Sequence, residues 1–327
     1  MKNLVIYLFI ILFALCIVSI SIGKYYIAPQ TVMKILASKL ISVERDWIDP
    51  METIVWNIRF PRVIGAMAVG SGLSMSAAIL QSMFQNPLVS PFILGVSSGA
   101  GFGACVAILL GMNRLMLQLS VFAGGIIAVT LTCLIGKERE DNSRMTMVLS
   151  GVIVGGFFTS LISALKYMAD PYTKLPEIVF WLMGSIAFIS NENLLWIMPV
   201  IIFSMAVLYL YRWKFNILGL GEYEAKSLGE NAGRLKMLGI VFTTMLVSAT
   251  VSIAGVIGWV GLVIANTARM ITGPDLVKLV PVSALMGAIY LLFIDDIARN
   301  LTNVEIPLGI LTSLVGAPVF IYILRKK

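Results

Sequence analysis

Long apolar runs recur from one end of the sequence to the other and alternate with short polar segments. Each run holds about 20 residues, enough for a helix to cross a hydrocarbon core of about 30 Å. Helices also bond every backbone N–H and C=O within the run, as lipid requires. The pattern therefore predicts an all-α, polytopic membrane protein in which residues 1–327 form a single domain. Ten helices are expected, near residues 3–23, 59–82, 93–112, 115–136, 144–167, 193–211, 234–254, 257–270, 278–298 and 307–324.

Composition and terminal charge support a membrane location and set an orientation. Hydrophobic residues make up 59% of the chain and charged residues 13%, whereas soluble domains lie nearer one half and one quarter. The first run, residues 4–22, is too long for the apolar core of a signal peptide, so we expect it to remain as the first helix. Lys2 and the basic tail 325–327 place both termini in the cytoplasm, because cytoplasmic segments are enriched in Lys and Arg.

One charged segment, residues 212–236, interrupts the apolar pattern with the sequence RWKFNILGLGEYEAKSLGENAGRLK. It is predicted to project into the cytoplasm, and a plain solvated loop is the alternative. Residues 222–228 are expected to form a short helix with Ala225 and Leu228 on a shared face. Gly229 is expected to end that helix, since glycine commonly follows the last helical residue.

Two further local signals mark the ends of elements. Residues 176–184 are too few to span a bilayer, which predicts a half-helix or re-entrant segment at the outer surface. Asn231 is expected to cap the helix that follows it, because an Asn side chain there accepts a bond from the backbone N–H groups of the first turn.

The connection between the second and third helices combines helix breakers with side-chain amides. Pro87 and Pro91 interrupt the helix, while Gln81, Gln85 and Asn86 bring polar groups to its end. Irregular backbone at membrane depth is tolerated where it is buried in protein or lines a watery cavity. The connection is therefore a candidate pathway or gate element, with a simple cytoplasmic turn as the alternative.

Small residues recur every four positions on several helices, which brings them onto one stripe. Such stripes let helix backbones approach closely in a membrane. Close packing is the first interpretation, and a smooth wall along which helices slide is the second. The stripes are Gly95, Gly99, Gly103, Ala107 and Gly111; Ala68, Gly72 and Ser76; and Gly151 and Gly155.

Charged residues gather at the outer ends of two helices. Arg59 and Arg62 open the second helix, where a cation opposes the helix dipole. They predict an external anionic partner, and snorkelling of the arginines to lipid headgroups is the alternative. Asp295 and Arg299 stand four apart near the end of the ninth helix and are expected to pair.

Several absences limit the chemistry. The chain has no histidine, and its three cysteines are scattered through apolar runs without metal-ligand spacing. The expected spans hold almost no ionisable residue, which argues against a membrane enzyme and against an ion-coupled secondary transporter. No phosphate-binding loop motif is present. Energy for active transport is therefore expected from another subunit that docks on residues 212–236, and no metal site, cofactor or nucleic-acid partner is expected.

Several motifs occur in a set order along the chain. They are RFPR at 59–62, NPL at 86–88, LGVSSGA at 94–100, WLMGS at 181–185, GWVGL at 258–262, EIPLG at 305–309 and GAPVF at 316–320. In order and spacing, the sequence resembles the iron-chelate and vitamin B12 ABC-importer permeases over essentially its whole length.

This resemblance implies a type II ABC importer permease in the bacterial inner or plasma membrane. Two copies of the chain would form a homodimer around a central pathway, with two cytoplasmic ATPase subunits and an extracytoplasmic substrate-binding protein. The ATPases would bind ATP and drive alternating access, and this chain would carry no catalytic residue. The expected cargo is a metal chelate, most often a ferric siderophore; haem, a corrinoid such as vitamin B12, or an oxyanion are the alternatives.

The resemblance also implies roles for individual residues. Arginines matching Arg59, Arg62 and Arg299 would meet acidic residues of the binding protein, and the turn near Asn142 and Ser143 would join the 81–87 connection as a cytoplasmic gate. One departure is expected to alter a kink and a polar contact there: Ala265-Asn266 stands where the family usually has Pro-His. The ATPase-coupling candidates are Leu218, Gly219, Glu222, Ala225, Leu228 and Gly229.

Overall fold

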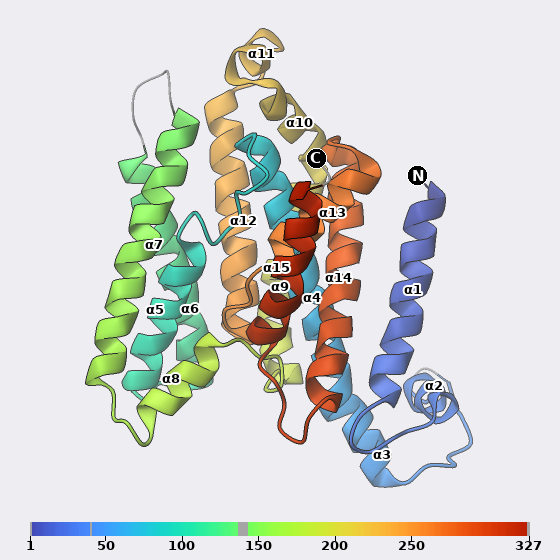
Figure 1. Cartoon of the computed structure of the whole chain (residues 1–327). Coiled ribbons are helices and arrows are strands. Elements are labelled where there is room, and N and C mark those ends of the chain that lie inside the picture. The colour runs from blue at the N-terminus through green and yellow to red at the C-terminus, as the bar shows by residue number, and fades with distance from the viewer. Residues whose placement is uncertain (1, 40, 137–142, 326–327) are drawn as a thin grey trace.

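The computed structural model describes residues 2–39, 41–136 and 143–325, and all regular structure within them is helical (Figure 1). The all-α prediction is confirmed, and all ten expected helices occur. They are α1 (Lys2–Ser21), α4 (Phe60–Met83), α5 (Val96–Leu109), α6 (Arg114–Ile135), α7 (Ser143–Met168), α9 (Asn191–Leu210), α12 (Ala232–Ala254), α13 (Val260–Thr272), α14 (Leu276–Asn300) and α15 (Leu308–Arg325).

Seven stretches among the described residues are long and apolar enough to cross a membrane. Three further apolar helices, α5, α13 and α15, are shorter. At 1.5 Å per residue the 14 residues of α5 and the 13 of α13 rise only about 20 Å. Non-helical segments must therefore complete the path of these helices across the membrane. As described below, these segments line a cavity.

Short helices lie at the two ends of the bundle (Figure 1). We call one the α8 end: it carries α8 (Lys174–Leu182), the half-helix expected at 176–184, and three elements that the pattern did not predict. The other is the α11 end, which carries α10 (Arg212–Leu220) and α11 (Glu222–Ser227) and at which both chain termini also lie. The three unpredicted elements at the α8 end are α2 (Pro29–Ala37), α3 (Asp49–Thr53) and the π-helical turn η1 (Ile54–Arg59).

Helix α4 forms the centre of the bundle and packs against α9, α12, α13 and α14. Its contact with α14 is the closest, because a Cβ atom built on Gly70 would lie 2.1 Å from the carbonyl oxygen of Gly287. The stripe on α5 packs in the same way, since a Cβ atom on Gly103 would lie 2.1 Å from the carbonyl oxygen of Ser120 on α6. Gly99, Gly103 and Gly151 of the predicted stripes therefore serve close packing, the first of the two interpretations, whereas a Cβ atom on Gly111 or Gly155 would meet no close neighbour.

Candidate functional site

Helices α13 and α15 and the segment that leads into α5 all border one cavity of about 730 Å³. Segments 88–93 and 256–259, which precede α5 and α13, form part of its wall. Irregular backbone at this depth is found where it lines a cavity, so the shortness of these helices and the cavity have one explanation. The lining residues are Leu88, Ser90, Phe92, Ile93, Leu182, Met183, Val256, Gly258, Trp259, Leu262, Gly309, Ile310, Ser313 and Phe320.

Backbone hydrogen bonds join three segments at the α8 side of this cavity. The Ser185 amide donates to the Ala254 carbonyl (2.8 Å), and the Leu308 amide donates to the Gly184 carbonyl (2.9 Å). Gly184 has φ +73°, and a Cβ atom there would lie 2.7 Å from the Val256 carbonyl oxygen. Only glycine meets both conditions without strain, so Gly184 of the WLMGS motif lets the end of α8 meet the α12–α13 connection and the start of α15.

Trp259 is the bulkiest residue of the wall and has an unusual backbone. Its φ is +68°, which is costly for a large side chain and persists only where the surroundings impose it. The side chain packs on Gly316, whose Cβ would lie 2.8 Å from that of Trp259, and its ring meets Phe320 edge to face at 6.3 Å. Helix α15 therefore holds Trp259 at the cavity, a role that the sequence signalled only through the GWVGL and GAPVF motifs.

The gate candidates from the 81–91 connection lie between the α11 end and this cavity. The Gln85 side chain donates from Nε2 to the Gly219 carbonyl of α10 (2.6 Å). The Gln85 backbone has φ +49°. Asn86 closes a local turn, because its Oδ1 accepts from the Leu88 amide (2.9 Å). Gln81 is 1% exposed, and neither of its side-chain amide atoms has a hydrogen bond within the described chain.

Asn266 supplies the second contact to this connection. Its Nδ2 donates to the Pro87 carbonyl (3.0 Å) and to the Leu262 carbonyl one turn earlier on α13 (2.8 Å). The Gln85 and Asn266 amides together join α10, the 85–91 connection and α13. Of the remaining gate candidates, Asn142 lies outside the described residues, and Ser143 is the first residue of α7.

The predicted coupling segment forms two short helices, α10 and α11, that pack on one another. Helix α10 buries Phe215 and Leu218, and its Asn216 is fastened to the start of α14. Asn216 Nδ2 donates to Asp275 Oδ1 (2.7 Å), while Asn216 Oδ1 accepts from the Leu276 amide (2.7 Å). Asn216 was not among the candidates, since a partner 59 residues away leaves no local signal.

Helix α11 begins at Glu222, and Gly229 follows its end as predicted. Gly229 has φ +79°, its amide donates to Lys226, and the next amide donates to the Ala225 carbonyl (2.9 Å), which is a Schellman ending. One prediction is wrong: Ala225 is fully buried whereas Leu228 is 61% exposed, so they do not share a face. Ala225 packs inward because α11 folds onto its neighbours. Asn231 caps α12 as predicted, accepting from the Arg234 amide (3.0 Å).

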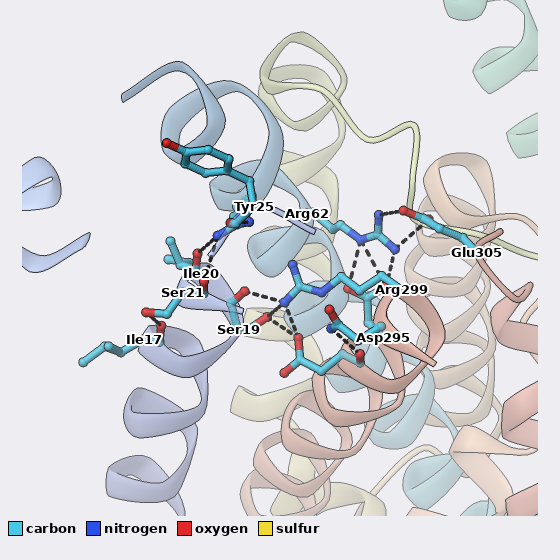
Figure 2. A network of polar contacts seen from close by, with 12 residues as sticks. Ile17, Ser19, Ile20, Ser21, Tyr25, Arg62, Asp295, Arg299 and Glu305 are labelled. Carbon is cyan, nitrogen blue, oxygen red and sulfur yellow. Dashed lines mark hydrogen bonds and ion pairs between the residues drawn. The ribbon is translucent and has the colours of Figure 1, made fainter. Parts of the chain in front are cut away.

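The candidate docking arginines lie at the α8 end and are buried, with between 5% and 7% of each exposed (Figure 2). Arg59 donates to the carbonyls of Ile20 (2.5 Å), Ser21 (3.0 Å) and Tyr25. These groups are at and just beyond the end of α1, where the last carbonyls have no partner within a helix. Arg59 therefore caps the negative end of the α1 dipole.

Two acidic residues of α14 divide between the other arginines (Figure 2). Arg62 is bidentate to Asp295 and also contacts Glu305, with Nη1–Oε1 at 2.9 Å. Arg299 bonds Asp296 and both oxygens of Ser19. The expected Asp295–Arg299 pair is therefore wrong, because a helix also permits pairing at three residues and Arg62 takes Asp295 from across the bundle.

Comparison with known proteins agrees with this arrangement. The profile of the FecCD transport family matches residues 10–326. The chain is 39% identical over 305 residues to the molybdate import system permease MolB of Haemophilus influenzae, covering 93% of this chain and 90% of that one. It is 35% identical over 303 residues to the vitamin B12 import system permease BtuC of Salmonella arizonae, covering 91% of each.

Another relative is a probable iron chelatin transport system permease of Helicobacter pylori, 39% identical over 279 residues that cover 85% of this chain and 84% of that one. Among solved structures, one described as an inward-facing conformation of a metal-chelate type ABC transporter has a TM-score of 0.89 and 36% identity and covers both chains fully. With the ten helices, the cavity at their broken ends and these matches, the chain belongs to the FecCD transport family of ABC importer permeases.

Proposed function

We propose that this chain is the membrane-spanning, non-catalytic subunit of an importer that moves a metal chelate through the 730 Å³ cavity by alternating access. The α11 end would face the cytoplasm and the α8 end the outside, with both termini inside. The observation that carries the proposal is the pair of amide contacts that connects the α10–α11 segment to the cavity wall.

The contacts suggest how motion of a cytoplasmic ATPase would reach the cargo. A displacement of α10 moves the Gly219 carbonyl, and with it Gln85, which is bonded to that carbonyl. Residues 88–93 follow directly in the chain and form part of the cavity wall. Asn266 ties the same connection to α13, so both irregular walls move together. Such coupling works only if the ATPase contacts α10–α11 differently in its two nucleotide states.

A second copy of this chain is proposed to complete the pathway. The cavity is open on one side, and its wall includes α15, which also presents the exposed side chains Leu314 (65%) and Tyr322 (61%). Two such half-cavities facing one another would enclose a cargo, and one ATPase beneath each copy would complete a symmetric assembly. ATP binds to those partners.

The binding protein is proposed to dock at the α8 end near Arg299. Arg299, Lys24 and residues 300–303 line an open cavity of about 700 Å³ there, so an acidic side chain could enter. Arg59 and Arg62 are committed to partners within the chain, as described above. In this proposal Arg59 and Arg62 support the docking surface from within the chain. An acidic group of the binding protein would accept hydrogen bonds from their guanidinium groups in addition to the partners that they already have.

A ferric chelate is the first candidate cargo. The cavity wall is apolar apart from Ser90 and Ser313 and carries no charged side chain. A chelate masks the charge of its metal and presents apolar surface, which such a wall accommodates at low cost. The second candidate is an oxyanion, favoured by the MolB relative.

Elemental analysis of the binding protein purified with the transporter separates the two cargoes. Iron held by an organic chelator supports the first, and molybdenum or tungsten in excess over iron supports the second. Reconstituted transport that proceeds without any ATPase would overturn the importer mechanism itself.

A further inference from the structure

A second cavity, of about 470 Å³, lies at the α8 end and shares no lining residue with the transport cavity. Residues of α6, α8, α9 and α12 line it, together with the α8–α9 connection. The transport proposal assigns nothing to it. Its lining residues include Arg114, Gln118, Glu177, Phe180, Phe188 and Asn193.

Polar side chains that have no partner face this cavity. Gln118 is only 7% exposed, yet its side-chain amide has no hydrogen bond within the described chain. Arg114 lies one turn earlier on α6 and likewise has no ion pair or hydrogen bond from its guanidinium. The Asn193 side-chain amide is also without a partner. The three side chains therefore constitute a set of donors at the cavity wall that are free to bond an acceptor within it.

The electrostatics of the cavity favour an anion at these donors. Arg114 is the first residue of α6 and Asn193 the third of α9, so two helix N-termini meet here. Each N-terminus carries partial positive charge, and a cation at the first helical position adds to it unfavourably. An anionic group placed between Arg114 and Gln118 would relieve that repulsion and accept the free donors.

The remaining walls are aromatic and border the lipid-facing surface. The rings of Phe180 and Phe188 meet edge to face at 6.3 Å, and Phe188 is 68% exposed. Leu119 of α6 and Leu195 of α9, just beside the cavity, are 54% and 72% exposed. Aromatic rings at a helix end next to an apolar surface are typical of the depth at which lipid headgroups lie. An occupant with a polar head and apolar tails therefore fits better than a soluble anion.

We propose that this cavity binds the headgroup of a membrane phospholipid, specifically phosphoethanolamine, in the leaflet at the α8 end. The phosphate lies against Arg114, Gln118 and Asn193. The ammonium lies toward Glu177, which is 56% exposed in its side chain and has only a 3.5 Å contact to Lys174. The acyl chains follow the exposed faces of α6 and α9. Because residues of α6, α8, α9 and α12 line the site, the bound lipid stabilises the packing of these four helices.

Native mass spectrometry of the permease purified with its ATPase tests this site. The wild-type protein is expected to keep one phosphatidylethanolamine after detergent washing. Gln118→Leu, of similar volume, removes the amide donors, and Arg114→Gln removes the positive charge. Each is expected to lower retention about tenfold, as loss of a neutral or a charge-assisted hydrogen bond implies. Lys24→Gln, which removes an exposed cation at the same end but outside this cavity, is the matched control and is expected to retain the lipid.

Three outcomes overturn the proposal. The first is equal retention of the lipid by wild type and by the Arg114→Gln variant. Because Arg114 is exposed, this variant is expected to fold even if Gln118→Leu does not. The second is thermal stabilisation by inorganic phosphate as large as that by phosphatidylethanolamine vesicles, which would identify a soluble-anion site. The third is unchanged preference for phosphatidylethanolamine over phosphatidylglycerol in Glu177→Gln. None of these measurements depends on transport activity, so the lipid proposal can fail without affecting the proposed cargo, and the reverse.

Discussion

Arg62 and Asp295 form a bidentate ion pair in the interior of the helix bundle, with Nε–Oδ2 and Nη2–Oδ1 both at 2.9 Å. Their side chains are 9% and 0% exposed. Removing one partner from such a pair leaves a buried charge uncompensated, which typically costs about 3–5 kcal/mol. The pair therefore constrains how α4 meets α14 at the end where docking is proposed.

Replacing Asp295 by Ala is expected to destabilise the permease by about 3–5 kcal/mol. Glu305→Gln is the matched control, since Glu305 contacts the same guanidinium but is 37% exposed; it is expected to cost no more than about 1 kcal/mol. Reversible unfolding in mixed micelles measures both. Equal losses of unfolding free energy in the two variants would show that the burial of Asp295 does not determine how much the ion pair stabilises the permease.

A charge reversal at Arg62 is consequently a poor test of docking. It would place two negative charges side by side in the interior, and the loss of stability would mask any loss of binding. Lys24→Glu is the cleaner test, because Lys24 lines the open cavity beside Arg299. The expected result is weaker association with the binding protein at low salt and unchanged melting of the permease, since rim charges act mainly on association rate. Association that is unaffected by Lys24→Glu at low salt would argue against docking at this cavity.

The α4–α14 contact provides a test of packing. Ala at Gly287 would bring its Cβ to 2.2 Å from the Gly70 carbonyl oxygen, so the helices must separate. We expect Gly287→Ala to destabilise by about 1–3 kcal/mol, the usual cost of overpacking a core. Gly156→Ala is the control: a Cβ there meets nothing within 4 Å, and Ala favours the helix by about 1 kcal/mol. Melting curves of the two variants should therefore shift in opposite directions.

Local features of the sequence predicted much of this structure, and non-local ones did not. The apolar runs predicted ten helices because length and hydrophobicity are local properties, and Asn231 was recognised by its capping chemistry. Helix α10 was not predicted because the charges of Arg212 and Lys214 interrupt the apolar pattern around Phe215, whose ring is buried only by tertiary packing. The partner of Asp295 was missed because Arg62 lies 233 residues away.

Asn266 tests whether the gate connection and α13 move as a unit. Asn266→Ala removes the donor to the Pro87 and Leu262 carbonyls and is expected to lower transport while leaving the basal ATPase rate of the assembled complex unchanged. Asn266→His, the residue type that the family resemblance implies at this position, should recover part of the transport because it keeps a donor. Uptake per ATP hydrolysed is the measurement, and full coupling in Asn266→Ala would exclude the contact from transmission.

Ala225 and Leu228 separate the structural and the docking roles of the coupling segment. Ala225 is fully buried, so Ala225→Glu would place a charge inside the α10–α11 pair and unfold it. Leu228 is 61% exposed, and Leu228→Glu should leave the permease as stable as the wild type. If the α11 end seats the ATPase, both variants lose ATP-driven uptake, but only Ala225→Glu lowers the melting temperature. Size-exclusion chromatography with the purified ATPase reports association directly. A Leu228→Glu permease that still elutes with the ATPase and still transports would show that the docking surface lies outside α11, because an added charge at the centre of an apolar contact weakens it by desolvation alone.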